Sequence, residues 1–198
     1  MTTKTLNISE EQLVDYSKAH NEPSWMTELR KKALKLTETL EMPKPDKTKL
    51  RKWDFDTFKQ HHTTGEAYTQ LTDLPKSVKE IIDVENSENL IIQHNNELAY
   101  TQVSDQAKHD GVIIEGLSEA LVNHSDLVQK YFMTKAVDVD EHRLTALHTA
   151  LVNGGIFVYV PKNTVVEHPI QYVVLHDDEQ ASFYNHVIIV TEESAEVR

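Results

Sequence analysis

Three strand-like runs follow one another in the last part of the chain, and no helical pattern separates them. They occupy residues 155–161, 169–178 and 181–193 and are rich in Val, Ile, Phe and Tyr. Turn-forming residues at 161–163 and 177–179 lie between them. Parallel strands joined by conventional crossover helices are therefore excluded. Two arrangements remain: an antiparallel sheet, or the first coils of a β-solenoid, in which each strand stacks on the next coil.

The amino-terminal segment predicts two helices. Ser9 is the expected N-cap of the first, with Gln12 placed to complete a capping box and an end near Ala19. Pro23 favours the start of the second helix, because a proline in the first turn loses no hydrogen bond, and prolines within residues 42–45 end it. Helical spacing of apolar residues predicts the buried face of this second helix: Trp25, Leu29, Ala33, Leu36 and Leu40.

The middle of the chain predicts a loop, a ribbon and two more helices. Residues 44–87 show neither helical nor strand periodicity. Residues 89–94 and 97–103 predict a two-stranded ribbon, because the two asparagines between them tolerate the backbone of a tight turn. Ser125 and Asp140 are the expected N-caps of the two helices. The second of these helices carries Leu144, Leu147 and Leu151 on one face. Asn153, Gly154 and Gly155 follow it, and glycines in this position are typical of a helix C-cap.

Composition excludes several classes of protein. The chain contains 32 Asp and Glu and 20 Lys and Arg, which gives a net charge of −12. This charge argues against a nucleic-acid-binding protein, because contacts with phosphates need a basic surface. Apolar runs are too short for a membrane span or signal peptide, so we expect a cytoplasmic protein without membrane contact. The sequence contains no Cys, which excludes thiolate metal sites, cysteine-ligated clusters and cysteine nucleophiles on this chain.

The eleven histidines show no metal-binding motif. Adjacent His61 and His62 favour a solvated loop, because neighbouring side chains on an extended chain point apart. His176, Asp178 and His186 form the best local group, although an exposed polar turn explains it more simply. Phosphate-binding and nucleophile motifs are also absent. We therefore predict no catalytic, cofactor-binding or metal-binding residue and a protein that is not an enzyme; an enzymatic site around His176 is the weakest alternative.

Positive charge is concentrated in residues 30–52, which hold nine Lys or Arg and three Asp or Glu, a local charge of +6. A solvated helix face and linker is the simpler interpretation. The alternative is a docking surface for an acidic partner, with Trp25 and Trp53 on either side as possible anchors. Core packing is predicted for Trp25, which lies on the expected buried face, whereas the role of Trp53 stays open.

Two stretches resemble a known family. Residues 145–170, TALHTALVNGGIFVYVPKNTVVEHPI, resemble the start of the β-helix core in the SufB/SufD family of iron–sulfur cluster assembly proteins. NEPSWM at 21–26, followed by PKP at 43–45 and by Trp53, is similar to the amino-terminal region of the SufD branch. His148 departs from the Asn expected in the first stretch. On a helix between leucines it is predicted to pack or cap rather than to bind metal.

The resemblance implies an α+β fold in two parts. Residues 1–152 would form a mainly helical amino-terminal domain with the small ribbon, and residues 153–198 the first strands of a right-handed parallel β-helix. Family members continue through a long β-helix and a carboxy-terminal helical domain. The chain is therefore expected to be a truncated, amino-terminal portion.

The resemblance also implies a function: a component of the SUF scaffold that supports cluster assembly and iron acquisition. Its partners would be a SufB-like scaffold subunit and a SufC-like ATPase, the latter docking through a carboxy-terminal region that this sequence lacks. The iron–sulfur cluster would be held by the full assembly, with no cofactor on this chain. The alternative is a self-contained small β-barrel that binds a ligand.

Overall fold

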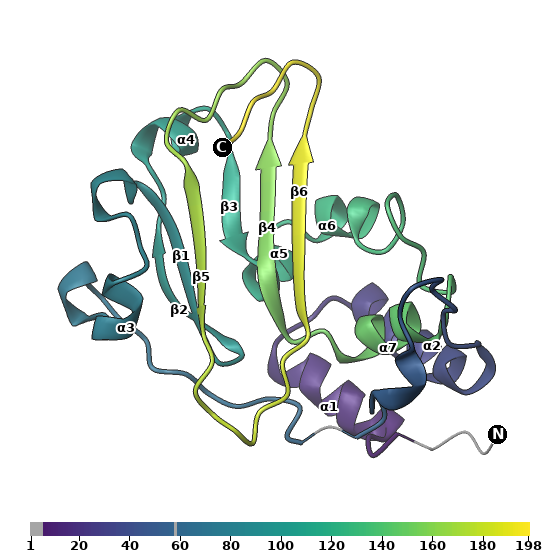
Figure 1. Cartoon of the computed structure of the whole chain (residues 1–198). Helices are drawn as coiled ribbons and strands as arrows, with labels where there is room; N and C mark the ends of the chain where they lie inside the picture. The colour runs from purple at the N-terminus through teal and green to yellow at the C-terminus, as the bar shows by residue number, and fades with distance from the viewer. Residues whose placement is uncertain (1–5, 58) are drawn as a thin grey trace. The chain divides into compact units, whose positions relative to one another are not determined.

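The computed structural model describes residues 6–57 and 59–198 (Figure 1). Its contacts group the chain into two compact units, each built from two segments of sequence. The helical unit comprises Met1–His61 and Leu121–Val152, and the sheet unit comprises His62–Ala120 and Asn153–Arg198.

The division of the chain into domains 1–152 and 153–198 stays a prediction. The structure changes unit after Val152, and it packs residues 62–120 with the carboxy-terminal strands. The reason is strand pairing, which joins the predicted ribbon to a strand far along the chain.

The first two helices begin where the local signals place them. Helix α1 spans Glu10–Ala19, and its predicted capping box is confirmed: the Ser9 hydroxyl accepts from the Gln12 amide at 3.2 Å, and the Gln12 side chain accepts from the Ser9 amide at 2.8 Å. Helix α2 spans Ser24–Thr39 with Pro23 as its N-cap. Both starts depend on interactions between residues three or fewer positions apart, which the sequence alone contains.

The predicted buried face of α2 was largely wrong. The buried residues are Met26, Arg30, Ala33 and Thr37, whereas the expected apolar residues other than Ala33 are only half-buried. Arg30 tolerates burial because it pairs with Glu22 at 2.6 Å and donates to the carbonyl of Ala150 at 3.0 Å. An ion pair and a carbonyl on a neighbouring helix, rather than the apolar stripe, therefore select the inward face.

Two predicted helix caps were wrong. Helices α5 (Leu117–Asn123) and α6 (Ser125–Tyr131) are followed by α7 (Arg143–Leu151). His124 is the N-cap of α6, while the Ser125 hydroxyl accepts from the Trp25 indole at 2.9 Å. His142, not Asp140, caps α7, because its ring nitrogen accepts from the Thr145 amide and the Thr145 hydroxyl accepts in return.

The glycines after α7 do not form the predicted C-cap. The helix ends with Val152 as its C-cap, and both glycines belong to the next strand. Gly155 has φ of 135°, and a Cβ there would lie 1.9 Å from the backbone oxygen of His186. These glycines therefore permit close approach of a neighbouring strand rather than a helix stop.

The prediction that residues 44–87 are mostly loop is confirmed. The segment contains only short helical turns: η1 (Leu50–Lys52), η2 (Leu71–Asp73), α3 (Lys76–Lys79) and η3 (Val84–Asn86). A further short helix, α4 (Asp105–His109), follows the ribbon.

The predicted ribbon is confirmed, and it belongs to a larger sheet. Strands β1 (Asn89–His94) and β2 (Glu97–Gln102) pair antiparallel around a turn in which Asn95 has φ of 52°. The other edge of β1 pairs parallel with β5 (Ile170–Leu175) along its whole length. This pairing explains why the ribbon packs with the carboxy-terminal strands.

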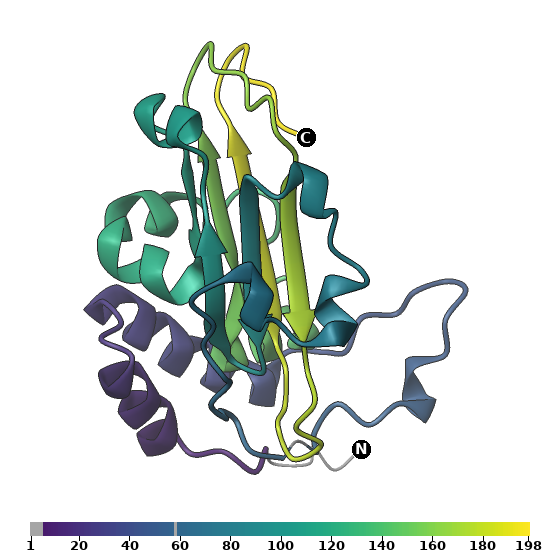
Figure 2. The same cartoon turned by 90° about the vertical axis from the view of Figure 1, so that its left-hand side faces the viewer.

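The second sheet has the order β3-β4-β6. Strand β3 (Ile113–Gly116) pairs antiparallel with β4 (Gly154–Val160), which pairs parallel with β6 (Asn185–Thr191). Residues 161–184, all described, contain β5 and no helix. Along the chain, β5 comes between β4 and β6, and Figure 2 shows that it runs downward whereas β4 and β6 run upward. Because β5 belongs to the other sheet and β6 returns to pair with β4, the chain makes one turn of a coil.

The register of that turn is constant. Gly154 pairs with Asn185, and Val165 forms a bridge with Glu196. The two partners are 31 positions apart in each pair (154 to 185 and 165 to 196). Of the two arrangements left open by the sequence, an antiparallel carboxy-terminal sheet is therefore wrong. Stacking in a fixed register is the arrangement observed.

The two sheets enclose one apolar layer. Ile91 of β1 packs with Ile114, Ile156 and Val158 of the facing sheet, all nearly inaccessible to solvent. The opposite face of β1 packs beneath α3, with Leu90 and Ile92 against Val78. Neither sheet closes on itself, because β2 and β5 are the edges of one and β3 and β6 the edges of the other. The predicted alternative, a closed β-barrel module, is not favoured by this topology.

Candidate functional site

The sheet unit presents two unpaired strand edges on the same side of the coil. Strands β5 and β6 each have an inner parallel partner and no partner on the other edge among the described strands. We call the outer edges of β5 and β6 the open edge; at the start of β5, the Ile170 amide already donates to the carbonyl of Arg198 at 2.8 Å. An unpaired edge carries a row of free N–H and C=O groups and is a template for a further strand.

Apolar side chains at the open edge continue the buried layer into solvent. Val187 and Ile189 are in register with Ile156 and Val158, so they lie on the same sheet face. The two residues of β4 are 3% and 1% exposed, whereas Val187 and Ile189 are 45% and 58% exposed. Ile188 between them faces the other side and is buried. The layer is thus complete over β4 and uncovered over β6.

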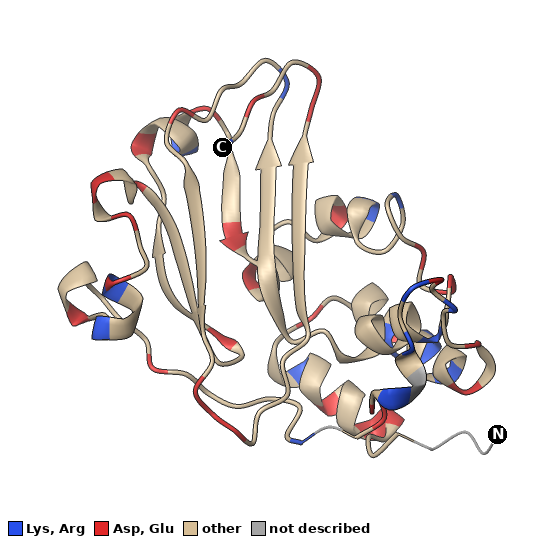
Figure 3. Cartoon of the chain, in the orientation of Figure 1, with Lys and Arg blue, Asp and Glu red and all other residues tan. Residues whose placement is uncertain are grey.

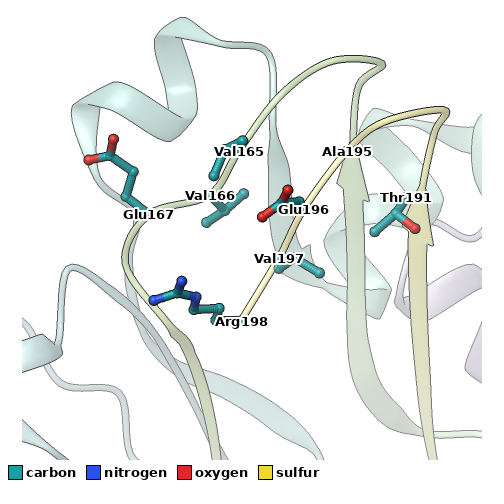
Figure 4. Close-up of a pocket in the computed structure, with 8 residues that line it drawn as sticks. All are labelled: Val165, Val166, Glu167, Thr191, Ala195, Glu196, Val197 and Arg198. Carbon is teal, nitrogen blue, oxygen red and sulfur yellow. The ribbon is translucent and has the colours of Figure 1, made fainter.

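A groove of about 550 Å³ lies beside these strands (Figure 4). Val165 and Val166 line one side, and Glu196 and Val197 lie on the facing segment. The two segments are joined by main-chain bonds, including Val166 to Glu196 at 2.9 Å. The groove therefore follows the backbone of these two bonded segments.

The predicted group of His176, Asp178 and His186 is not assembled into a metal site. His176 is exposed and stacks on Phe183 with 5.4 Å between ring centroids. The Asp178 carboxylate accepts from the amide of Gln180 at 2.8 Å. Within residues 6–57 and 59–198, no three His, Cys, Asp or Glu side chains form a metal-binding group. The simpler interpretation, a polar turn after β5, fits the observed geometry.

His61 and His62 contact different groups, and the expected solvated loop was wrong. Both side chains are half-buried. In the helical unit, the His61 ring lies 2.9 Å from the carbonyl of Leu151. In the sheet unit, the His62 ring lies 3.2 Å from the carboxylate of Glu97. Their contacts with the two units, rather than solvent, explain their partial burial.

His148 is partly buried, which fits the predicted packing role. It lies half-buried on α7, and burial, assisted by the nearby Arg30 charge, lowers the pKa of its ring. A lowered pKa keeps the ring neutral near pH 7, which suits a packed position.

The structure shows a histidine contact that the sequence does not predict. The nearly buried His94 ring lies 2.9 Å from the carboxylate of Asp177 through Nε2. Its Nδ1 accepts from the amide of Glu66 at 2.9 Å, so the ring proton lies on Nε2 and is donated to the carboxylate. The bond from His94 lowers the pKa of Asp177. Strand pairing brings together residues far apart in sequence, and no local signal reveals this.

A buried glutamine ties the two sheets together beside this contact. Gln93 is 3% exposed, and its oxygen accepts from the Gly155 amide at 3.0 Å and from the Tyr172 hydroxyl at 2.6 Å. Its nitrogen donates to the carbonyl of Asn95 at 2.8 Å. Burial raises the pKa of Tyr172, which keeps its hydroxyl a donor. The polar groups inside the coil are thus structural.

The two tryptophans have different environments. Trp25 is half-buried, its indole bonds to Ser125, and its ring lies 6.4 Å from that of Phe132. The core packing predicted for Trp25 is thus only partly right: its ring packs against Phe132 but is not fully buried. Trp53 is 63% exposed. In the described part of the chain, no helix has the length and apolar character needed to cross a membrane.

Comparison with known proteins gives a consistent result. Residues 9–172 match the family model described as the SufBD protein N-terminal region. The chain is 46% identical over 193 residues to the iron–sulfur cluster assembly protein SufD of Bacillus subtilis, an alignment that covers 97% of this chain and 44% of that protein. It is 30% identical over 201 residues to an iron–sulfur cluster assembly SufBD family protein of Pyrococcus horikoshii, covering 96% of this chain and 44% of that protein. The chain thus spans less than half the length of these relatives.

Proposed function

Because the chain belongs to the SufBD family, we propose that it is the amino-terminal part of a SufD-like component of the SUF iron–sulfur cluster assembly scaffold. The observation that carries the proposal is the 46% identity to a named SufD along 97% of this chain. The match includes both units, so it is not confined to a single motif.

We further propose that the observed turn of coil is the first of a parallel β-helix, right-handed as in the family, which residues following Arg198 would extend. Three features support this: the constant register of 31 positions, the unpaired edges of β5 and β6, and the exposure of Val187 and Ile189. A following coil would pair the edges and cover the apolar side chains. The relatives are long enough to supply it, since this chain spans 44% of their length.

In this proposal the chain has a scaffold role and no catalytic role. Its partners would be a SufB-like subunit and a SufC-like ATPase in the cytoplasm, and the whole assembly would support iron acquisition. The iron–sulfur cluster is cargo built on the assembly, and this chain is not a ligand to it. The absence of Cys from the sequence supports that last point, because cysteine thiolates are the usual cluster ligands.

A chimera tests the function. Residues 1–198 would replace the aligned segment of Bacillus subtilis SufD in cells that lack their own SufD. We expect restored activity of iron–sulfur enzymes in extracts, whereas a chimera carrying an unrelated α+β segment of equal length should not restore it. A chimera that folds and accumulates normally but leaves those enzymes inactive would refute the proposal.

Reconstitution tests the proposed absence of a cluster on this chain. The purified chain, incubated with iron and sulfide and then desalted, should retain no cluster absorption in the visible range. Stable absorption of a bound cluster would show that side chains other than thiolates ligate it, and the scaffold role would need revision.

A further inference from the structure

A single buried arginine holds both ends of an exposed loop in the helical unit. Arg143, at the start of α7, is 6% exposed. Its backbone amide donates to the carbonyl of Glu41 at 2.9 Å, and its guanidinium lies 2.5 Å from the carboxylate of Asp56. The guanidinium also donates to the carbonyl of Thr37 at 2.8 Å. We call residues 42–55, between these two anchor points, the clamped loop.

The clamped loop presents uncompensated positive charge. Lys47, Lys49 and Lys52 are exposed, and none of them forms an ion pair with another described residue. Lys44 differs, because it pairs with Glu41 at 2.6 Å. Figure 3 shows the blue segments of this loop around η1. The side chain of Arg51 lies outside the described residues.

Acidic residues of the loop do little to neutralise these lysines. The Asp54 carboxylate accepts from the amides of Asp56 and Thr57 at 3.0 and 3.2 Å, so it stabilises the turn at the end of the loop. Asp46 is the other acidic residue of the loop, and it is exposed. By sequence, residues 42–55 contain five basic and two acidic residues, a charge of +3.

An aromatic pair lies beside the free lysines. Trp53 is 63% exposed and stacks on Phe55, with 5.9 Å between centroids and 18° between ring planes. An exposed tryptophan next to charged groups is typical of an interface anchor, because removal of its large ring from water by a partner makes the free energy of binding more favourable. Trp25 differs, because it is half-buried, bonds to Ser125 and packs against Phe132.

We propose that the clamped loop is a docking site for an acidic segment of a partner protein, with Trp53 as apolar anchor and Lys47, Lys49 and Lys52 as carboxylate-binding groups. The clamp holds the backbone ends in place before binding, which lowers the entropy lost on association. The proposed docking site does not depend on the proposed scaffold function, since it is argued from the contacts, exposure and charge of the described residues.

Charge favours a protein over a nucleic acid or an anionic membrane. By sequence, the helical unit carries +1 and the sheet unit −13, which sum to the −12 of the chain. A long polyanion needs an extended basic surface and would be repelled by the strongly acidic remainder. A short acidic segment needs only contacts within the Debye length of about 8 Å, which a compact loop can supply.

Binding of one defined peptide tests the proposal on the full chain. The probe is a synthetic peptide of glutamates interrupted by Leu and Phe, and binding is followed by calorimetry at physiological salt. We expect saturable binding that Lys49→Glu with Lys52→Glu weakens by about tenfold or more. Trp53→Ala should weaken it to a similar extent. Retained far-ultraviolet circular dichroism would show that each variant is folded.

The matched control changes the same net charge elsewhere. Lys32 and Lys135 are also exposed and form no ion pair with the described residues, and Lys32→Glu with Lys135→Glu should weaken binding by about twofold or less. Equal weakening by both double variants, or no saturable binding by the parent chain, would overturn the proposal. Tighter binding of a single-stranded oligonucleotide or of phosphatidylserine vesicles than of the peptide would also overturn it.

Discussion

Replacing Glu22 by Gln should destabilise the helical unit by about 3 kcal/mol, because it leaves the Arg30 charge buried without its partner. The two side chains are 4% and 2% exposed and share two bonds, at 2.6 and 2.8 Å. Net values of about 1.5–3 kcal/mol for each charge-assisted bond give a similar total. Gln keeps the shape and one acceptor oxygen, which places the loss near the lower end of the range of about 3–5 kcal/mol for broken buried pairs.

The same pair should make stability depend on pH. Burial alone would raise the pKa of Glu22, but the Arg30 charge more than offsets burial and holds the pKa below its usual 4.5. A depressed folded-state pKa stabilises the protein above the unfolded-state value, and this stabilisation is lost as pH falls through the folded-state value. The parent chain should therefore lose more stability on acidification below about pH 4.5 than Glu22→Gln does.

Urea unfolding followed by fluorescence provides the measurement, in a Trp53→Phe background so that the emission comes from Trp25. A double variant, Glu22→Gln with Arg30→Met, removes both charges and should recover most of the lost stability. The exposed pair of Glu41 and Lys44 is the control, because Glu41→Gln should leave the unfolding midpoint unchanged. A loss below about 1 kcal/mol for Glu22→Gln, or no recovery in the double variant, would refute the reasoning.

Three other changes have definite expected outcomes in the sheet unit. Gly155→Ala should lower the free energy of unfolding by at least about 2 kcal/mol, because φ is 135° and the new Cβ would lie 1.9 Å from a backbone oxygen. Hydrogen exchange in β4 and β6 should become faster, and unchanged exchange would contradict this prediction. The open edge should make the isolated chain self-associate, and Val187→Lys with Ile189→Lys should reduce this in sedimentation. A parent chain that stays monomeric at high concentration would be the contrary result. Asp177→Asn should flatten the acid limb of the stability curve, because the bond from His94 lowers the pKa of this carboxyl and the resulting stabilisation is lost as pH falls; identical acid limbs in urea titrations would argue against it.

The candidate site followed from the sequence only in part. The strand runs and the absence of helices between them predicted stacked coils as one of two options, and the parallel pairing of β4 with β6 excludes the other option, an antiparallel sheet. The partial exposure of β6 could not be predicted, because the apolar side chains of Val187 and Ile189 are typical of a buried strand, whereas β6 is an edge strand of its sheet. The contact between His94 and Asp177 also has no local signal, since the parallel pairing of β1 with β5 brings them together.

Helix caps show where local signals succeed and where they fail. Ser9 caps α1 as predicted because its partner, Gln12, lies within the same turn. Ser125 has equally good capping chemistry, yet its hydroxyl accepts from Trp25, which lies a hundred positions earlier in the chain. His142 takes the cap of α7 in place of Asp140 because its ring nitrogen can accept from the Thr145 amide. A cap is thus predictable only when no distant group competes for the same side chain.

The sequence by itself determined the strand and helix types, the hairpin turn at Asn95 and the family, because these depend on periodicity and on interactions between near neighbours. Tertiary structure decided which face of α2 is buried, that the ribbon joins β5, and that one arginine, Arg143, holds both ends of the clamped loop. These features depend on ion pairs and strand edges that meet only after the chain has folded. For the basic tract of residues 30–52, the sequence alone gives the net charge. Only the structure shows that Arg30 is buried in an ion pair, whereas Lys47, Lys49 and Lys52 are exposed.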